Sequence, residues 1–367
     1  MNNTKNSGLI LLISCVLLSS CSVLIPKILP FNNIPAPTGF YSVGTQIFDW
    51  EDTNREEWFT ENPEDFRKIV VQVWYPAEKI DGYPAPYLDF AQRRIKPISE
   101  QVELPPFMIN HIQEVKSNSY LNAPIKTAIE SYPLIIFSHG LGGMRMQNTI
   151  QMEELASRGF IAIAMDHPFD ANVTFFNDGS KADFRSAYVG DINPDNFWKI
   201  RLPQINTRAA DVSFILDTIQ EYQDQNEEFW SLIDLERVGV MGHSFGGGTA
   251  IVASSKDPRL DACVALDGWL VPIEKSIIKK GLNVPFLYMG RSYWDNPVNY
   301  ENLDTLIAAS TGKVEKLILD GTKHFDYSDT PQFSTASRRF GISGSIDINE
   351  LRHLLNNQIV TFFKNNL

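Results

Sequence analysis

The stretch that decides the fold is "RVGVMGHSFGGGTAIVASS", residues 237–255. An apolar run at 238–241 leads into a Gly-x-Ser-x-Gly motif, and the small residues that follow suit the start of a helix. A serine on a sharp turn between a strand and a helix is held exposed in a strained conformation. The flanking Gly242 and Gly246 allow the two elements to approach closely. The stretch therefore predicts that Ser244 is a nucleophile and that the next helix N-terminus stabilises nearby negative charge.

Apolar runs alternate with amphipathic stretches from residue 132 to the C-terminus. The first run, "YPLIIFSHG", is continuous and has the composition of a strand buried on both faces. The other predicted strands are "IAIAMDHP", "RVGVMG", "ACVALD", "VPFLYMG" and "VEKLILDG". Amphipathic stretches at 207–223 and 348–366 predict helices. This alternation predicts an α/β fold, with a mostly parallel central sheet and helices on both of its faces. The site is then expected in the loops after the carboxyl ends of the strands.

The region upstream of this pattern is less regular. "KIVVQVWYPAE" predicts a strand, whereas residues from about 81 to 130 lack strong strand signals and are expected to form an insertion in a single domain. Within the insertion, "LPPFMINHIQ" carries apolar residues near the expected mouth of the site. This segment is either a lid or lipid-facing patch or a packed helix.

A second glycine-rich loop, "IIFSHGLGGMR", follows the first of these buried strands. Acyl transfer builds negative charge on a carbonyl oxygen, so backbone N–H groups must point at that atom. Phe245, directly after the serine, is expected to supply one N–H group, and Leu141 in the glycine loop the other. His139 either orients this loop or has a purely structural role.

The base must be one of six histidines: His111, His139, His167, His243, His324 and His353. Side chains of adjacent residues in a tight turn point apart, which disfavours His243. Where a nucleophilic serine stands on such a strand-to-helix turn, called a nucleophile elbow, the chain order is serine, acid, histidine. This order leaves His324 and His353. His324 lies in a loop just after a predicted strand, whereas His353 lies inside the last amphipathic stretch, so His324 is the predicted base.

The acid has two candidates. Asp267 ends the strand "ACVALD", and Asp295 follows the next strand, which is the commoner position for this residue. Asp320 and Asp326 lie too close to the histidine in sequence to be first choices. Strand position alone slightly favours Asp295.

Several motifs together resemble the platelet-activating-factor acetylhydrolase family of the plasma type, which are α/β-hydrolases. "GHSFGG" matches the elbow of that family, "FSHGLGG" is similar to its oxyanion loop, "ALDGW" looks like its aspartate motif and "DGTKHF" its histidine motif. The resemblance runs from about residue 37 to the last helix. It implies the α/β-hydrolase fold and the triad Ser244, Asp267 and His324. It also implies a serine ester hydrolase that cleaves short or oxidised acyl chains from phospholipids or related esters through an acyl-enzyme.

A weaker resemblance is to bacterial cutinases and polyester hydrolases, in which the acid would correspond to Asp295. It implies an alternative function as a general short-chain carboxylesterase or polyester hydrolase. A third hypothesis is a non-catalytic, lipid-anchored binding protein that has kept a hydrolase fold. Such proteins usually lose a triad residue or an elbow glycine, and this chain keeps them all.

The N-terminus has the pattern of an export signal. Residues 1–20 contain an apolar run too short to span a membrane, as in a signal peptide. "LSSC" resembles the bacterial lipobox, which predicts lipidation of Cys21. The proline-rich residues 21–38 are expected to be a tether, and residues 39–367 the catalytic domain. The protein is thus expected to be lipid-anchored to the cell envelope or, alternatively, secreted.

Composition excludes some classes of function. The chain has 367 residues and a formal net charge of −12, which argues against a nucleic-acid partner. The sequence offers no cluster of metal ligands, so no metal or cofactor is expected. The predicted partners are a small-molecule or lipid ester and a membrane, and the oligomeric state is left open.

Overall fold

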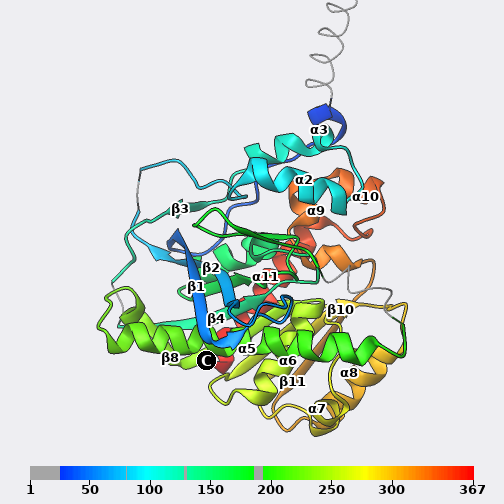
Figure 1. Ribbon diagram of the computed structural model, residues 1–367. Helices are drawn as coiled ribbons and strands as arrows, with labels where there is room; N and C mark the ends of the chain where they lie inside the picture. Colours follow the sequence, from blue (N-terminus) through cyan, green and yellow to red (C-terminus); the bar gives the residue numbers. More distant parts are fainter. Residues whose placement is uncertain (1–24, 80, 128–129, 186–192) are drawn as a thin grey trace, which may run out of the picture.

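The computed structural model of the protein describes residues 25–79, 81–127, 130–185 and 193–367. Within these residues a nine-stranded sheet runs through the centre of the molecule (Figure 1), in the order β11-β10-β9-β8-β4-β5-β2-β1-β3. Strand β2 is antiparallel to both of its neighbours, and the other neighbouring pairs of this sheet are parallel. The strands are β1 (Ser42–Glu56), β2 (Phe66–Ala77), β3 (Ser119–Leu121), β4 (Tyr132–Ser138), β5 (Ile161–Asp166), β8 (Ile233–His243), β9 (Ala262–Leu266), β10 (Phe286–Arg291) and β11 (Val314–Leu319), and a small hairpin pairs β6 (Val173–Phe175) with β7 (Lys181–Asp183).

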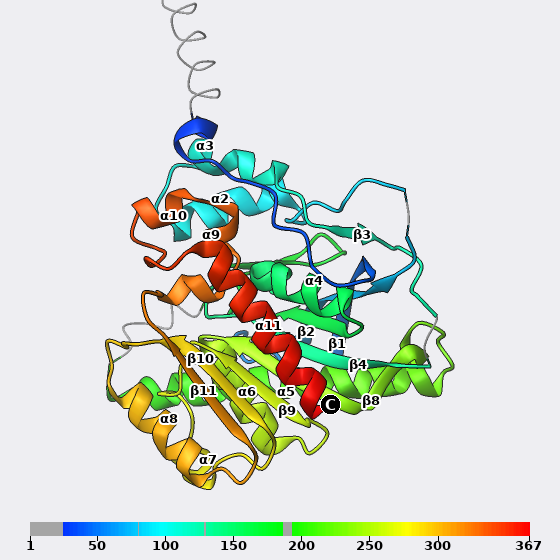
Figure 2. The same ribbon diagram turned by 180° about the vertical axis from the view of Figure 1, so that it is seen from behind.

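Helices cover both faces of the sheet. On one face lie α5 (Phe197–Asp224), α6 (Phe245–Lys256), α7 (Lys275–Lys280) and α8 (Val298–Ala309), and on the other lie α4 (Thr149–Ser157) and α11 (Ile348–Asn366), which crosses the sheet in Figure 2. Alternate residues of a strand point to opposite faces. In β4, Leu134 and Ile136 accordingly pack in the core on the face covered by α5 to α8, and Ile135 and Phe137 pack in the core on the face covered by α4 and α11. The predicted mostly parallel sheet with helices on both faces is confirmed.

The predicted insertion forms one end of the molecule. It contains α2 (Ala91–Gln101), α3 (Pro106–Ile109) and the 3-10 helix η1 (Asn110–Glu114), which lie near α9 (Thr330–Phe333) and α10 (Ala336–Arg339) in Figure 1. Its last segment, β3, pairs with β1 and extends the main sheet. The segment "LPPFMINHIQ" was expected to be either a lid or lipid-facing patch or a packed helix. Within it, Phe107 is 57% exposed whereas Ile109 is buried against Leu29 and Ala336. The stretch therefore presents one apolar side chain to solvent and uses another for packing.

A buried carboxyl group ties this insertion to helix α4. Glu153 accepts hydrogen bonds from Asn118 N at 2.7 Å, Asn118 Nδ2 at 2.9 Å and Ser119 Oγ at 2.5 Å. Burial raises the pKa of Glu153 to about 7, although these hydrogen bonds act in the opposite direction. The side chain is thus poised to change charge near neutral pH.

The predicted tether needs a correction. Residues 25–38 lie against the domain, with Leu29 and Ile34 buried. Thr38 donates from its backbone N–H and its hydroxyl to the Glu154 carboxylate, each at 2.7 Å. The segment begins with a helical turn at residues 25–28, in which Leu29 N donates to Ile25 O at 2.8 Å. Proline content indicates a tether, but it carries no information about partners elsewhere in the sequence. The packed domain therefore begins before residue 39.

The predicted signal peptide, residues 1–20, and Cys21 lie outside the described residues. Among the helices that the structure describes, none combines the length and apolar composition needed to cross a bilayer. Cys263, in the middle of β9, is a free and fully buried thiol. This agrees with its prediction as a strand residue.

Candidate active site

Ser244 stands at the junction of β8 and α6 with a φ angle of +57°. A non-glycine residue in this region is strained, and such strain persists only where the surroundings enforce it. The enforcing contacts are close: a Cβ atom on Gly246 would lie 1.9 Å from Ser138 O, and one on Gly242 would lie 2.1 Å from Gly246 O. Only glycine fits at these two positions. The turn holds Ser244 half-buried at the carboxyl end of the central strands.

The structure brings Asp267 and His324 together. Asp267 follows β9 and is fully buried, and its Oδ2 atom lies 2.5 Å from His324 Nδ1. Its Oδ1 atom accepts hydrogen bonds from the indole Nε1 of Trp294 at 3.0 Å and from Arg291 N at 3.3 Å. His324 begins the 3-10 helix η4 (His324–Tyr327) after β11, with its side chain 24% exposed. The Asp267 carboxylate thus holds Nδ1 of the His324 imidazole, and Nε2 is left available to accept a proton.

Asp295, which its position after the next strand slightly favoured as the acid, is exposed on the turn after β10. Its neighbour Trp294 points inward from the same turn and donates to Asp267. The fold-based preference is therefore not supported by the geometry, whereas the pairing implied by the acetylhydrolase resemblance is present. The described contacts include no hydrogen bond from Ser244 Oγ, and such bonds often form only when substrate is bound.

The glycine loop after β4 lies against the elbow. Three of its backbone N–H groups already have acceptors. Gly140 N donates to Gln147 Oε1 at 3.2 Å, Gly142 N to Asp170 O at 2.8 Å and Gly143 N to Gly140 O at 2.9 Å. Among the described residues, neither Leu141 N nor Phe245 N has an acceptor. These are the two N–H groups that the sequence predicted as oxyanion donors.

His243, the neighbour of the serine, has a different task. It is 2% exposed, and its Nδ1 atom accepts from Gln147 Nε2 at 2.7 Å while its Nε2 atom donates to the carbonyl oxygen of His324 at 3.0 Å. Burial, reinforced by the nearby His324, holds the pKa of His243 well below its usual value. His243 is therefore a neutral connector between the glycine loop, through Gln147, and the backbone of His324.

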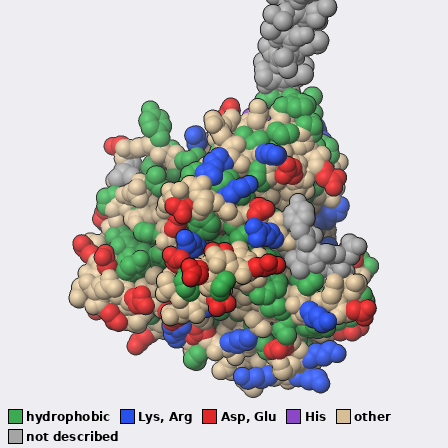
Figure 3. Space-filling view, viewed as in Figure 1, with side chains coloured by type: hydrophobic (Ala, Val, Ile, Leu, Met, Phe, Trp, Pro, Cys, Tyr) green, Lys and Arg blue, Asp and Glu red, His purple; other side chains and the backbone are tan. Residues whose placement is uncertain are grey.

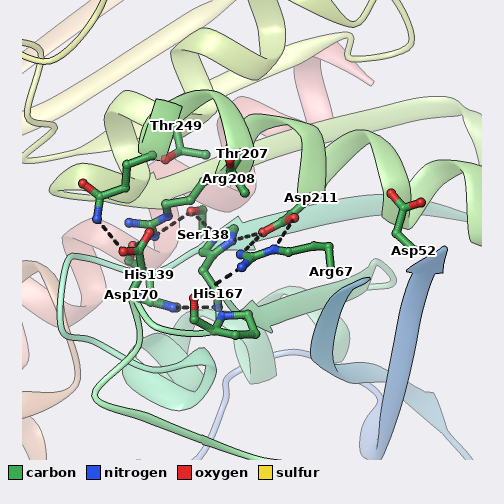
Figure 4. Close-up of polar contacts among 12 residues, drawn as sticks. Asp52, Arg67, Ser138, His139, His167, Asp170, Thr207, Arg208, Asp211 and Thr249 are labelled. Atoms are coloured by element: carbon green, nitrogen blue, oxygen red, sulfur yellow. Dashed lines mark hydrogen bonds and ion pairs between the residues drawn. The ribbon is translucent and has the colours of Figure 1, made fainter. Parts of the chain in front are cut away.

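A second serine–histidine–aspartate chain lies behind the glycine loop (Figure 4). Ser138 Oγ is 2.9 Å from His167 Nε2, and His167 Nδ1 is 2.7 Å from Asp211 Oδ2. All three side chains are completely buried, so no ester can reach this serine. Arg67 forms two hydrogen bonds to Asp211, at 3.1 and 2.7 Å. No local sequence pattern predicts this network, because its members come from β2, β4, α5 and the loop after β5.

These observations define the class. A mostly parallel sheet, a strained serine between a strand and a helix, and a histidine–aspartate pair in the loops after β9 and β11 are the features of an α/β-hydrolase. No group of three or more potential metal ligands occurs among the residues that the structure describes.

Comparisons with known proteins give the family. The model of the family described as platelet-activating factor acetylhydrolase, isoform II, matches residues 29–367, and the chain belongs to this family. It is 27% identical over 362 residues to a platelet-activating factor acetylhydrolase from Canis lupus familiaris, covering 92% of this chain and 78% of that protein. A cutinase, est2 from Thermobifida alba, is 28% identical over 198 residues, 53% of each chain.

Among solved structures, a ferulic acid esterase from Streptomyces cinnamoneus superposes with a TM-score of 0.74. It is 25% identical, and the match covers 92% of this chain and 93% of that one. The predicted resemblance and fold class are confirmed. The protein is an ester hydrolase similar to platelet-activating factor acetylhydrolases.

Proposed function

We propose that Ser244 attacks the ester carbonyl while His324 takes the hydroxyl proton through Nε2. Asp267 holds Nδ1–H of the imidazole and stabilises its charged form, and the N–H groups of Leu141 and Phe245 bind the oxyanion. His324 then protonates the leaving alcohol, and water repeats the cycle on the acyl-enzyme. The observation that carries this proposal is the 2.5 Å contact between Asp267 Oδ2 and His324 Nδ1 at the edge of the sheet where Ser244 stands.

The proposed substrates are phospholipids with a short or oxidised acyl chain, or related esters. Family membership supports this class, since the Canis lupus familiaris relative is a platelet-activating factor acetylhydrolase. The second candidate is a general short-chain carboxylesterase or polyester hydrolase, favoured by the cutinase and ferulic acid esterase matches. A panel of p-nitrophenyl esters of increasing chain length, beside short-chain, oxidised and long-chain phospholipids, separates the two. Preference for phospholipids with a short sn-2 chain supports the first candidate, and equal turnover of polyester and phospholipid supports the second.

The catalytic assignment has its own test, which is labelling with a fluorophosphonate followed by peptide mapping. Labelling confined to Ser244, and abolished in Ser244→Ala, is the expected result. A wild-type protein that hydrolyses none of the esters and takes up no label would instead support the non-catalytic binding protein.

We further propose that Cys21 is lipidated and that the protein is exported and anchored to the cell envelope. The support is the sequence pattern at residues 1–21 and the apolar surface at the end of the molecule where the described chain begins. Ile28, Val102 and Phe107 are 61%, 47% and 57% exposed, and Figure 3 has hydrophobic side chains gathered at this end. Cys21→Ser should move the protein from the membrane to the soluble fraction. Unchanged fractionation would contradict the anchor.

A further inference from the structure

His139, in the glycine loop, is held in a single form. Its Nδ1 atom lies 2.6 Å from the carbonyl oxygen of Gly140, which can only accept a hydrogen bond. Its Nε2 atom faces the backbone N–H of His167, which can only donate, at 3.1 Å. The ring must therefore be neutral, with its proton on Nδ1. Burial, followed by the charge of Arg208, keeps the pKa of His139 well below its usual value, which preserves this form.

The hydrogen bond from His139 fixes the orientation of one peptide group. Gly140 O accepts both His139 Nδ1–H and the N–H of Gly143, at 2.6 and 2.9 Å. The C=O of Gly140 and the N–H of Leu141 belong to the same planar trans peptide and point in opposite directions. Fixing the carbonyl from one side therefore aims the Leu141 N–H toward the other side. That N–H has no acceptor among the described residues and is one of the two proposed oxyanion donors.

The completely buried Ser138–His167–Asp211 chain holds the partners of His139 in place. Arg208 donates to Ser138 Oγ at 3.1 Å and to the carbonyl oxygen of His139. Ser138 then donates its hydroxyl proton to His167 Nε2, because His167 Nδ1–H is committed to Asp211. Burial and the charge of Arg208 lower the pKa of His167 to about 3, so this ring also stays neutral.

We propose that His139 is a positioning residue for the oxyanion hole, and that the Ser138–His167–Asp211 chain is the frame that keeps it in the Nδ1–H form. The inference rests on the proposed serine-esterase function. Loss of the Nδ1–H donor leaves Gly140 O with the Gly143 N–H as its remaining donor. The Gly140–Leu141 peptide is then held less firmly, so the Leu141 N–H no longer points steadily at the developing negative charge. Removal of an oxyanion donor costs about 10²–10³ in kcat, and a misaimed donor should cost about 10- to 100-fold.

Two amide variants distinguish loss of the Nδ1–H donor from loss of the packing of the ring. In His139→Asn the amide NH2 group takes the place of Nδ1 and still reaches Gly140 O. In His139→Gln the amide reaches the place of Nε2, and Gly140 O loses its donor. His353→Gln, at an exposed position on α11, is the matched control. For each protein, kcat and KM on p-nitrophenyl acetate are measured per fluorophosphonate-labelled Ser244, together with the Ki of a trifluoromethyl ketone.

The expected result is a fall in kcat of about 10- to 100-fold in His139→Gln, with KM changed by less than about twofold. The trifluoromethyl ketone should bind more weakly by a similar factor, because its adduct carries an oxyanion. His139→Asn should keep at least about tenfold more activity than His139→Gln. Equal losses in both variants, or losses that disappear after correction for the labelled fraction, would overturn the proposal.

A measurement on the wild-type protein does not depend on how the variants fold. Nitrogen-15 NMR of histidine-labelled protein distinguishes the two neutral ring forms, and His139 is expected to give the Nδ1–H pattern across the pH range of activity. A ring protonated on Nε2, or a charged ring at neutral pH, would refute the inference. A wild-type protein with neither ester hydrolysis nor labelling would refute the proposed function itself, and this inference with it.

Discussion

Replacement of Asp267 by asparagine tests the proposed mechanism most directly, because the surroundings of the carboxylate dictate how the amide must sit. Oδ1 faces two donors that cannot change their protonation, the indole Nε1–H of Trp294 and the N–H of Arg291. Oδ2 also lies 3.1 Å from Arg291 Nε but forms no hydrogen bond to it, so the two hydrogen bonds to Oδ1 favour the amide oxygen on that side. The amide NH2 group then faces His324 Nδ1, which is 2.5 Å from Oδ2 in the native protein. A donor facing Nδ1 forces the imidazole proton onto Nε2.

The position of this proton on Nε2 determines the effect on catalysis. An imidazole with its proton on Nε2 cannot accept the proton of Ser244, although the fold and the oxyanion donors remain intact. A carboxylate-to-amide change of this kind in a serine hydrolase lowers kcat by about 10⁴. KM should change little, since Asp267 is buried and does not reach the substrate.

The assay is p-nitrophenyl acetate hydrolysis, with Asp295→Asn as the matched control because Asp295 is exposed. Circular dichroism and thermal melting check that both variants are folded. Asp295→Asn should retain nearly full activity. If Asp267→Asn keeps more than about a tenth of the wild-type kcat, or if Asp295→Asn loses more than Asp267→Asn, the tautomer argument is refuted.

Three further outcomes are expected. Ser244→Ala should lose about 10⁶ in kcat, measured on the same ester, while its melting temperature stays within a few degrees. Glu153 has a folded pKa of about 7, above its ordinary 4.5, so the folded state binds more protons between these values and stability falls as pH rises through this window, by up to about 3 kcal/mol. Denaturant unfolding at pH 5 and pH 8 checks this, and a Glu153→Gln variant with an equally large difference would contradict it. Phe107→Ser should weaken liposome binding without changing hydrolysis of a soluble ester, because the side chain is 57% exposed; unchanged binding would argue against a lipid-facing role.

Local patterns predicted much of the site. The turn at Ser244 is a local structure that follows a strand and opens a helix, with a glycine two residues before and after the serine. Ser244 could therefore be proposed as the nucleophile from nearby residues alone. The loop histidine after a predicted strand gave His324 in the same way. The acid could not be chosen by such reasoning, because the ends of β9 and β10 lie side by side at the same edge of the sheet. Motif resemblance favoured Asp267 over Asp295, and the contact with His324 agrees.

The sequence by itself determined the class of fold and which serine and histidine are the candidates for nucleophile and base, because periodicity and turn chemistry act over a few residues. Only the tertiary structure decided what His243 and His139 touch, and that residues 25–38 pack against the domain instead of hanging free. Those outcomes depend on pairs such as Gln147 with His243 and Thr38 with Glu154, which lie 96 and 116 residues apart in the chain. A hydrogen bond needs donor and acceptor within about 3 Å, and no local pattern records which distant atom will arrive there.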